Sequence, residues 1–466
     1  MNFSPRLPAL VAFTLVAFFP PAARAAGLSS WPEWRGTTGQ GVAPGATPPT
    51  MWGDEKNIRW KAKIGGLGFS TPIIWKDRVF LLTAVETAET PAGATAAAPT
   101  PPAPAPAPGG GGEGRGKGGK RGPGGFGGGG RPTKVVEFTV VALDRATGKT
   151  VWSKVARREV PHEGKHQTNS FASASPLTDG EHLYVSFGSR GLFCYDLQGI
   201  LKWEKDLGDM QTRNGFGEGS SPALAGDFLI VPWDQETGSF IVALNKKTGA
   251  EVWRQARDER TSWATPLIVP VAGKQQAVLP ATKRTRSYDV ATGEMIWEAS
   301  GLGTNVIPTP VTGHGMVYVT SGFQGFYIQA IKLTARGDVS TGPDMVWQQR
   351  KGTPYVASPV LSGDRIFVTK EREAFLSCLN ALTGEFHFVD QPLEGMRGGI
   401  YASPLAANGH LYVVGREGLT YVLKDTTKFE VVARNTLSER IDASPVAVDK
   451  ELYLRGHEHL YCIAER

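Results

Sequence analysis

Eight Ser-Pro or Thr-Pro dipeptides, each followed by an apolar, β-rich run, divide the chain into units of similar length. The prolines are Pro72, Pro176, Pro222, Pro266, Pro310, Pro359, Pro404 and Pro445. Their separations are 104, 46, 44, 44, 49, 45 and 41 residues, so only the first is irregular. A repeat of this length is typical of architectures in which one unit cannot bury its apolar surface alone and must pack against its neighbours.

Each unit has the pattern of short strands rather than helices. An apolar run follows the proline, as at 182–186 (HLYVS) and 410–414 (HLYVV), and such runs favour strands. A second run ends in a turn of the type Ala-Leu-Asp-x-x-Thr-Gly, as at 142–148. In that turn the Asp or Asn side chain can bond its own backbone, and Gly allows a positive φ. Four short strands in about 40–45 residues predict one blade of a β-propeller.

A large aromatic residue accompanies the turn in most units, usually four positions after its glycine. Aromatic side chains contribute much buried area on a sheet face, and a residue repeated in every unit is more readily explained by packing than by catalysis. We therefore predict that these side chains are wedges between neighbouring blades. The set is Trp60, Trp152, Trp203, Trp253, Trp297, Trp347 and Phe388.

The last unit, 442–466, stops after three strands, whereas a matching fourth strand with Trp60 lies near the other end, at 57–64. Pairing these two segments would remove an open sheet edge. We predict an all-β, eight-bladed propeller of four-stranded blades over residues 57–466, whose last blade is closed by this N-terminal strand.

The first residues resemble a Sec-type signal peptide, which we place at 1–25. Arg6 precedes an apolar run at 7–19, and Ala23-Arg24-Ala25 offers a small-x-small cleavage site. The run is too short to span a bilayer, so we expect a periplasmic or secreted protein without a transmembrane segment. A leader segment, 26–56, then precedes the propeller.

The long first gap holds a low-complexity insertion at 88–132, rich first in Pro and Ala and then in Gly and basic residues. Such composition cannot offset its ordering entropy, so we expect a disordered loop between the second and third strands of the first blade. The loop is either a tether for an anionic polymer or a neutral expansion. Much of the formal net charge of +6 lies in this insertion and in the first 26 residues. The propeller is then nearly neutral, and we expect no nucleic-acid partner.

Three cysteines, Cys194, Cys378 and Cys462, fall in the third strands of three different units. Free cysteine behaves as a small buried hydrophobe, and residues in different blades are poorly placed to pair. No C-x-x-C spacing for zinc or haem occurs.

The unit Ser-Pro … Leu-Tyr-Val … Ala-Leu-Asp-x-x-Thr-Gly-x-x-x-Trp resembles the pyrroloquinoline-quinone-like (PQQ-like) propeller repeat of exported, BamB-like proteins. The leader motif Trp31-Pro-Glu-Trp34-Arg-Gly36 is similar to that of a large subgroup. The resemblance implies one of two functions. The scaffold members assist assembly of outer-membrane β-barrels and are usually lipoproteins, whereas this sequence lacks a lipid-attachment cysteine.

The enzymatic members are alcohol or sugar dehydrogenases that bind PQQ and Ca²⁺ at the axis, typically with a vicinal disulfide, a Glu, an Asn and an Asp base. Here Glu218 and Asn305 are two possible ligands, but there is no Cys-Cys pair and no haem-attachment motif. We therefore expect a non-catalytic binding or scaffold module without a cofactor, and retain the PQQ- and Ca-dependent dehydrogenase as the alternative.

The loop that precedes each first strand should form the rim of the central channel. Convergent loops on a rigid ring make the usual concave site, and arginines there suggest an anionic or carbohydrate-like ligand or an envelope protein. The alternative is a set of solvated loops at a channel mouth. Candidate contacts are Arg213, Glu218, Trp263, Asn305, Tyr355, Arg397 and Tyr401.

His162 and His166 lie four residues apart but in a predicted loop, so we expect no metal site from that pair. We expect a monomer.

Overall fold

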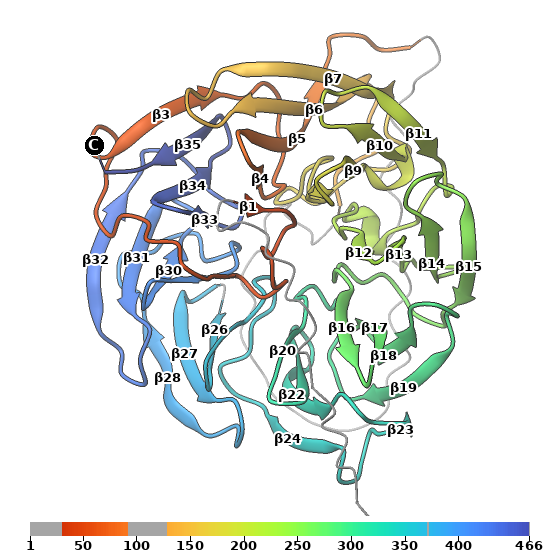
Figure 1. Ribbon diagram of the computed structural model, residues 1–466, viewed down its shortest axis with the longest axis vertical. Coiled ribbons are helices and arrows are strands. Elements are labelled where there is room, and N and C mark those ends of the chain that lie inside the picture. The colour runs from red at the N-terminus through yellow and green to blue at the C-terminus, as the bar shows by residue number, and fades with distance from the viewer. Residues whose placement is uncertain (1–29, 92–127, 371, 466) are drawn as a thin grey trace, which may run out of the picture.

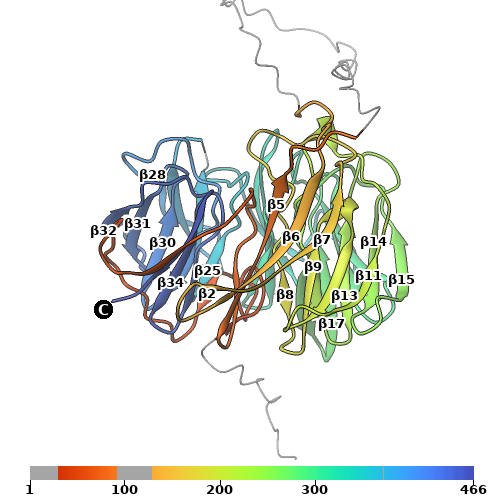
Figure 2. The ribbon, with the colours of Figure 1, turned by 90° about the horizontal axis from the view of Figure 1, so that it is seen from above.

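The computed structural model describes residues 30–91, 128–370 and 372–465. Its strands form eight small antiparallel sheets arranged around a central axis, which confirms the eight-bladed propeller (Figure 1). Figure 2 shows the strands running between the two faces of the ring. No helix in these ranges is long and apolar enough to cross a membrane. The predicted signal peptide, 1–25, lies outside the described residues.

Blades 1 to 4 follow the chain in order. Blade 1 holds β4 (Ile73–Trp75), β5 (Arg78–Glu86), β6 (Val136–Asp144) and β7 (Thr150–Glu159); blade 2 holds β8 (Leu177–Thr178), β9 (His182–Ser186), β10 (Leu192–Asp196) and β11 (Leu201–Lys205). Blade 3 holds β12 (Ala223–Ala225), β13 (Phe228–Trp233), β14 (Phe240–Asn245) and β15 (Glu251–Ala256); blade 4 holds β16 (Leu267–Val271), β17 (Lys274–Leu279), β18 (Arg284–Asp289) and β19 (Met295–Ser300). The strand β23 (Gly337–Asp338) covers the outer edge of blade 4.

Blades 5 to 8 complete the ring. Blade 5 holds β20 (Val311–Gly313), β21 (Met316–Gly322), β22 (Phe326–Lys332) and β24 (Met345–Gln349); blade 6 holds β25 (Val360–Ser362), β26 (Arg365–Lys370), β27 (Phe375–Asn380) and β28 (Phe386–Pro392). Blade 7 holds β29 (Leu405–Ala407), β30 (His410–Val414), β31 (Leu419–Lys424) and β32 (Val431–Thr436); blade 8 holds β33 (Val446–Val448), β34 (Glu451–Arg455), β35 (His459–Ile463) and β3 (Ile58–Lys63). Two single-turn 3-10 helices, η1 (Gly188–Arg190) and η2 (Arg213–Gly215), lie in loops.

The two ends of the propeller share blade 8, as the sequence predicts. The N-terminal strand β3 pairs antiparallel with β35, and Trp60 lies opposite Cys462 while Lys61 lies opposite Tyr461. The outer edge of β35 is thereby covered, and the ring closes between the first and last parts of the chain. The three cysteines are buried and unpaired in β10, β27 and β35.

Five of the repeated tryptophans lie over the turn glycine of the next blade. Each of these glycines has a positive φ, and a Cβ added there would approach the indole to 2.6–2.9 Å, so the turn has no room for a larger residue. Each indole Nε1 also donates to a backbone carbonyl of that turn, with distances of 2.8–3.1 Å. The pairs are Trp60 with Gly148, Trp152 with Gly199, Trp203 with Gly249, Trp253 with Gly293 and Trp347 with Gly384.

The other two members of the aromatic set reach the next blade without this turn contact. Trp297 is fully buried in one cluster with Val317 and Val319 of blade 5. Phe388 packs edge-on against Phe429, in the blade 7 loop, at a ring distance of 5.8 Å. The aromatic residue therefore joins two blades at seven of the eight outer strands, and in blade 7 the smaller Ala433 occupies this position on β32.

Replacing Trp203 with alanine should lower the free energy of unfolding by about 3–5 kcal/mol, because the wedge between blades 2 and 3 is lost and a cavity remains. Trp203→Phe keeps most of the packing but removes the N–H donor to the Lys246 carbonyl, so it should cost less than Trp203→Ala. Chemical denaturation monitored by circular dichroism measures both. Equal losses for the two variants would contradict the packing role of the ring.

Candidate functional site at the propeller axis

A ring of hydroxyl groups surrounds the axis where the innermost strands begin. Each Ser or Thr that precedes the repeated proline in blades 2 to 8 accepts a hydrogen bond from the backbone N–H of the equivalent residue in the preceding blade. Seven such links, of 2.9–3.1 Å, run from blade 1 to blade 8. The hydroxyl residues are Thr71, Ser175, Ser221, Thr265, Thr309, Ser358, Ser403 and Ser444. Six of them, all except Thr309 and Ser358, line the axial cavity described below.

The leader segment crosses the region near the axis (Figure 1). Its strand β1 (Ser30–Trp31) pairs with β4 of blade 1, and β2 (Val42–Ala43) pairs with β29 of blade 7, which blade 8 separates from blade 1. Arg35 is only 4% exposed and donates to the carbonyls of Pro404 and Pro359 at 3.2 and 2.5 Å. Burial lowers the pKa of Arg35 to about 9. The neighbouring Trp34 lines the axial cavity, so the leader forms part of the cavity wall.

The axial cavity, which we call the funnel, has a volume of about 1270 Å³ and is lined by loops of the rim, by the hydroxyl ring and by Trp34. Five of the seven predicted contact residues line it: Arg213, Trp263, Asn305, Tyr355 and Tyr401. The other two do not. Glu218 lines a smaller neighbouring cavity, and Arg397 is exposed and lines neither.

Aromatic rings form much of the funnel wall. Phe323 and Tyr355 stack with ring centres 5.1 Å apart. Trp263 is fixed by its Nε1 donor to the Gly217 carbonyl at 2.7 Å. The face of Tyr401 is already covered by the guanidinium of Arg416, whose central carbon lies 3.8 Å from the ring centre. The sequence had not indicated Phe323, which lies in the loop between β21 and β22 rather than before a first strand.

Asn305 is the one predicted contact residue with an unsatisfied polar atom. It is 3% exposed, its φ is +57°, and its Oδ1 has no hydrogen-bond partner among the described residues. Buried polar atoms are normally paired, and a strained backbone is retained where it places a side chain usefully. Asn305 thus places a buried amide oxygen without a partner beside the funnel wall.

The carboxylates and the bases of the funnel have different environments. Asp442 accepts hydrogen bonds from Arg416 and His457, and, although burial opposes it, these contacts lower its pKa. Glu86 pairs with Lys134 at 2.7 Å. Burial lowers the pKa of both Lys165 and His166, and the charges of Arg416 and Lys165 lower that of His166 further. Both acids that line the funnel in the described ranges are thus ion-paired.

Residues at the end of the insertion contact the rim. Gly128 donates to the Asn214 carbonyl at 2.9 Å, and Gly129 donates to the Lys165 carbonyl at 2.8 Å. A side chain at Gly128 would meet backbone atoms at 2.1–2.5 Å, so only glycine fits there. Residues 92–127, the greater part of the predicted insertion, lie outside the described residues.

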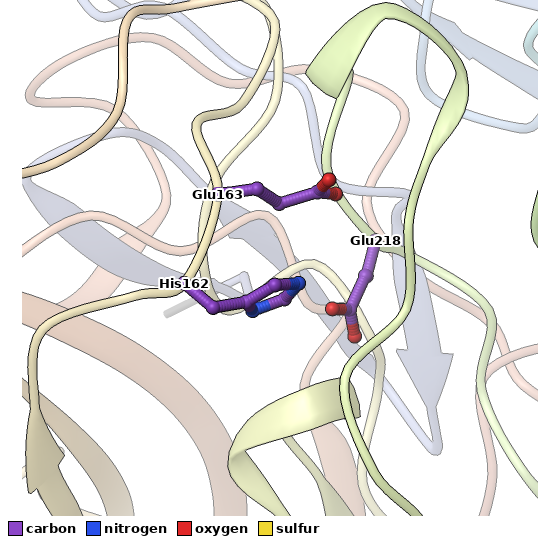
Figure 3. A group of neighbouring side chains, drawn as sticks. All are labelled: His162, Glu163 and Glu218. Carbon is purple, nitrogen blue, oxygen red and sulfur yellow. The ribbon is translucent and has the colours of Figure 1, made fainter. Parts of the chain in front are cut away.

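The smaller cavity, of about 50 Å³, brings together His162, Glu163 and Glu218 (Figure 3). One ligand atom from each lies within 4.8 Å of the others. Burial raises the pKa of Glu218 to about 7 and also raises that of Glu163. His166, for which no metal site with His162 was expected from the sequence, contacts Thr168 at 2.8 Å and lines the funnel. Sequence inspection weighed the two histidines together and missed Glu218 as a neighbour, because it lies 56 residues from His162 in the next blade's loop.

Comparisons with solved structures agree with this architecture. The crystal structure of BamB from Moraxella catarrhalis superposes with a TM-score of 0.52 and 14% identity, covering 71% of this chain and 92% of that one. Quinohemoprotein alcohol dehydrogenase from Comamonas testosteroni gives a TM-score of 0.58 and 9% identity, with 95% and 82% covered. Quinohemoprotein alcohol dehydrogenase ADHIIG from Pseudomonas putida HK5 gives 0.55 and 10%, with 93% and 80% covered. At these identities the likeness shows the fold alone.

No curated protein matches the chain by sequence. A family model described as outer membrane protein assembly factor BamB matches residues 136–388, which is more than half of the chain. With its eight PQQ-like blades, this chain belongs to that family.

Proposed function

We propose that the chain is an exported, non-catalytic binding module of the cell envelope, periplasmic or secreted, that holds a ligand or a segment of a partner protein in the funnel. The observation that carries this proposal is the funnel itself. It is a cavity of about 1270 Å³, bordered by the leader and lined by aromatic rings, hydroxyls and an unsatisfied amide oxygen. Concave sites with few polar groups among aromatic side chains are the usual form of a ligand site.

The chemistry of the lining favours an anionic, ring-bearing ligand of the carbohydrate class. Arg213 and Lys165 supply positive charge on one side, and the Phe323–Tyr355 stack offers a flat apolar surface. Arginine is well suited to bidentate recognition of carboxylate or phosphate. Asn305 Oδ1 can accept a hydrogen bond from a ligand hydroxyl.

The alternative, a PQQ- and Ca-dependent alcohol or sugar dehydrogenase, receives less support from the side chains. Calcium takes six or more oxygen ligands, yet the two residues considered for it line different cavities, Glu218 the smaller one and Asn305 the funnel. A base facing the quinone would need a free carboxylate, and Asp442 and Glu86 are both engaged in ion pairs. The residues present therefore do not fit that pair of cofactors well, and we derive no step through them.

Arg213→Ala should weaken binding of glucuronic acid oligomers by about 10-fold or more, because a charge-assisted hydrogen bond is lost. Arg397→Ala is the matched control, since Arg397 is exposed and outside the funnel. Isothermal titration calorimetry measures both, with neutral glucose oligomers as the uncharged comparison. Equal affinities for wild type and Arg213→Ala, or equal losses in the two variants, would contradict a ligand site in the funnel.

Mixing the purified chain with PQQ and Ca²⁺ distinguishes the two functions. We expect neither quinone absorbance that co-elutes with the protein nor dye reduction that depends on an added alcohol or sugar. Size-exclusion chromatography followed by a dye assay measures both. Retained quinone together with substrate-dependent reduction would replace the binding module by the dehydrogenase.

A further inference from the structure

The smaller cavity holds three metal-ligating side chains from two consecutive blade-connecting loops. His162 and Glu163 come from the loop before blade 2, and Glu218 comes from the loop before blade 3. In Figure 3 the three side chains point toward a common space. Their ligand atoms lie within 4.8 Å of one another. Ligand atoms held at ~2.0–2.2 Å from one ion are about 3–4 Å apart, so small side-chain movements would suffice to bind one.

Each ligand already has partners that orient it. Glu163 accepts hydrogen bonds from the backbone N–H and the hydroxyl of Thr212. Glu218 accepts from the backbone N–H and the hydroxyl of Ser189, at 2.7 and 2.5 Å. Each such carboxylate keeps lone pairs for another ligand. Outer partners of this kind fix the ligands of protein metal sites.

The imidazole of His162 lies between a carbonyl and a carboxylate. Its Nε2 is 2.6 Å from the Met210 carbonyl, and its Nδ1 is 3.6 Å from the Asp209 carboxylate. A cation bound at Nε2 would take the place of the proton that the carbonyl now accepts, and the neutral imidazole would carry its proton on Nδ1 instead. Nδ1–H would then face Asp209, once the Arg190 Nη2 that now lies 3.2 Å from Nδ1 turns to its own carboxylate partners, and this is the carboxylate–histidine–metal arrangement. The Met210 carbonyl is then a fourth candidate ligand.

The local charge favours a cation. The carboxylates of Glu163 and Glu218 share the cavity with Arg190, whose Nη2 is 3.2 Å from His162 Nδ1. However, that guanidinium is already paired with two other acids, Glu159 and Asp209. Four carboxylates thus surround one arginine, so the cluster carries an excess of negative charge.

The geometry points to a site for a divalent transition-metal ion, formed by His162, Glu163 and Glu218 and completed by the Met210 carbonyl. Mixed nitrogen and oxygen ligands suit both Zn²⁺ and Mn²⁺, and such a ligand set binds Zn²⁺ more tightly than Mn²⁺. Calcium prefers oxygen ligands alone, so this site should reject it. The cavity of about 50 Å³ leaves room beside the ion for a water molecule. The site is separate from the funnel and does not depend on the function proposed for it.

Calorimetric titration of the EDTA-stripped full chain with ZnCl₂ at pH 7.5 tests the site. We expect one zinc ion per chain with a Kd of about 10 μM or tighter, and no heat of binding with CaCl₂. His162→Gln and Glu218→Gln should each weaken zinc binding at least ~100-fold, because each loses a ligand. His387→Gln is the control for surface binding, since His387 is exposed on β28.

A melting experiment without metal shows that the variants are folded. His162→Gln and Glu218→Gln keep side chains of similar size, so circular-dichroism melting of the metal-free variants should give transition temperatures close to that of the wild type. Absence of zinc binding in the wild type, or unchanged zinc affinity in both ligand variants, would overturn the proposed site.

Discussion

In blades 1 to 7 a backbone N–H donates to a hydroxyl of the next blade close to the axis, and the rest of the ring depends on this link. The repeated dipeptide explains it. Proline has no N–H and restricts the preceding residue to an extended conformation, so the hydroxyl residue presents its own N–H sideways. One such bond contributes only about 0.5–1.5 kcal/mol net. An N–H left buried without its acceptor costs about 1–3 kcal/mol, so the links enforce the ring geometry more than they stabilise it.

The tryptophan wedges act at the outer radius of the same interfaces. An indole such as Trp203 lies on a turn that only glycine can make and donates to that turn's backbone. Six neighbouring pairs of blades, from blades 1 and 2 to blades 6 and 7, are thus held at two radii, by a hydroxyl near the axis and by an aromatic ring nearer the periphery. Two contacts at different radii fix the angle between neighbouring sheets. The loops at the rim are consequently carried on a rigid base, and this is what allows them to form a defined funnel.

The repeat made the fold predictable from the sequence, because strand pattern, turn and wedge recur with one period. Closure by the strand around Trp60 followed from counting strands, and its pairing with Cys462 confirms it. The site was harder to predict. A position before a first strand places a residue near the rim, but it does not determine where the side chain points. Tyr355 therefore lines the funnel, whereas Arg397 is exposed outside it.

Contacts between loops of different blades could not be predicted at all from single positions. Glu218 meets His162 because the loops before blades 2 and 3 are neighbours at the rim, and the repeat gives no signal for the conformations of these loops. The same applies to the leader, whose motif was visible but whose path across the axis was not. Arg35 reaches carbonyls of blades 6 and 7 through such a path.

The two cavities share part of their walls, and one short segment contributes functional side chains to both. Residues 212–218 carry Arg213 into the funnel and Glu218 into the smaller cavity, and the Gly217 carbonyl between them accepts the hydrogen bond that fixes Trp263. Trp263 itself borders both cavities. An ion held by Glu218 would therefore restrain the same backbone that positions two funnel residues. Coupling of this kind needs no movement of the blades. A first ligand that orders the loop has already reduced the conformational entropy of the loop, so the binding of a second ligand to the same loop costs less entropy.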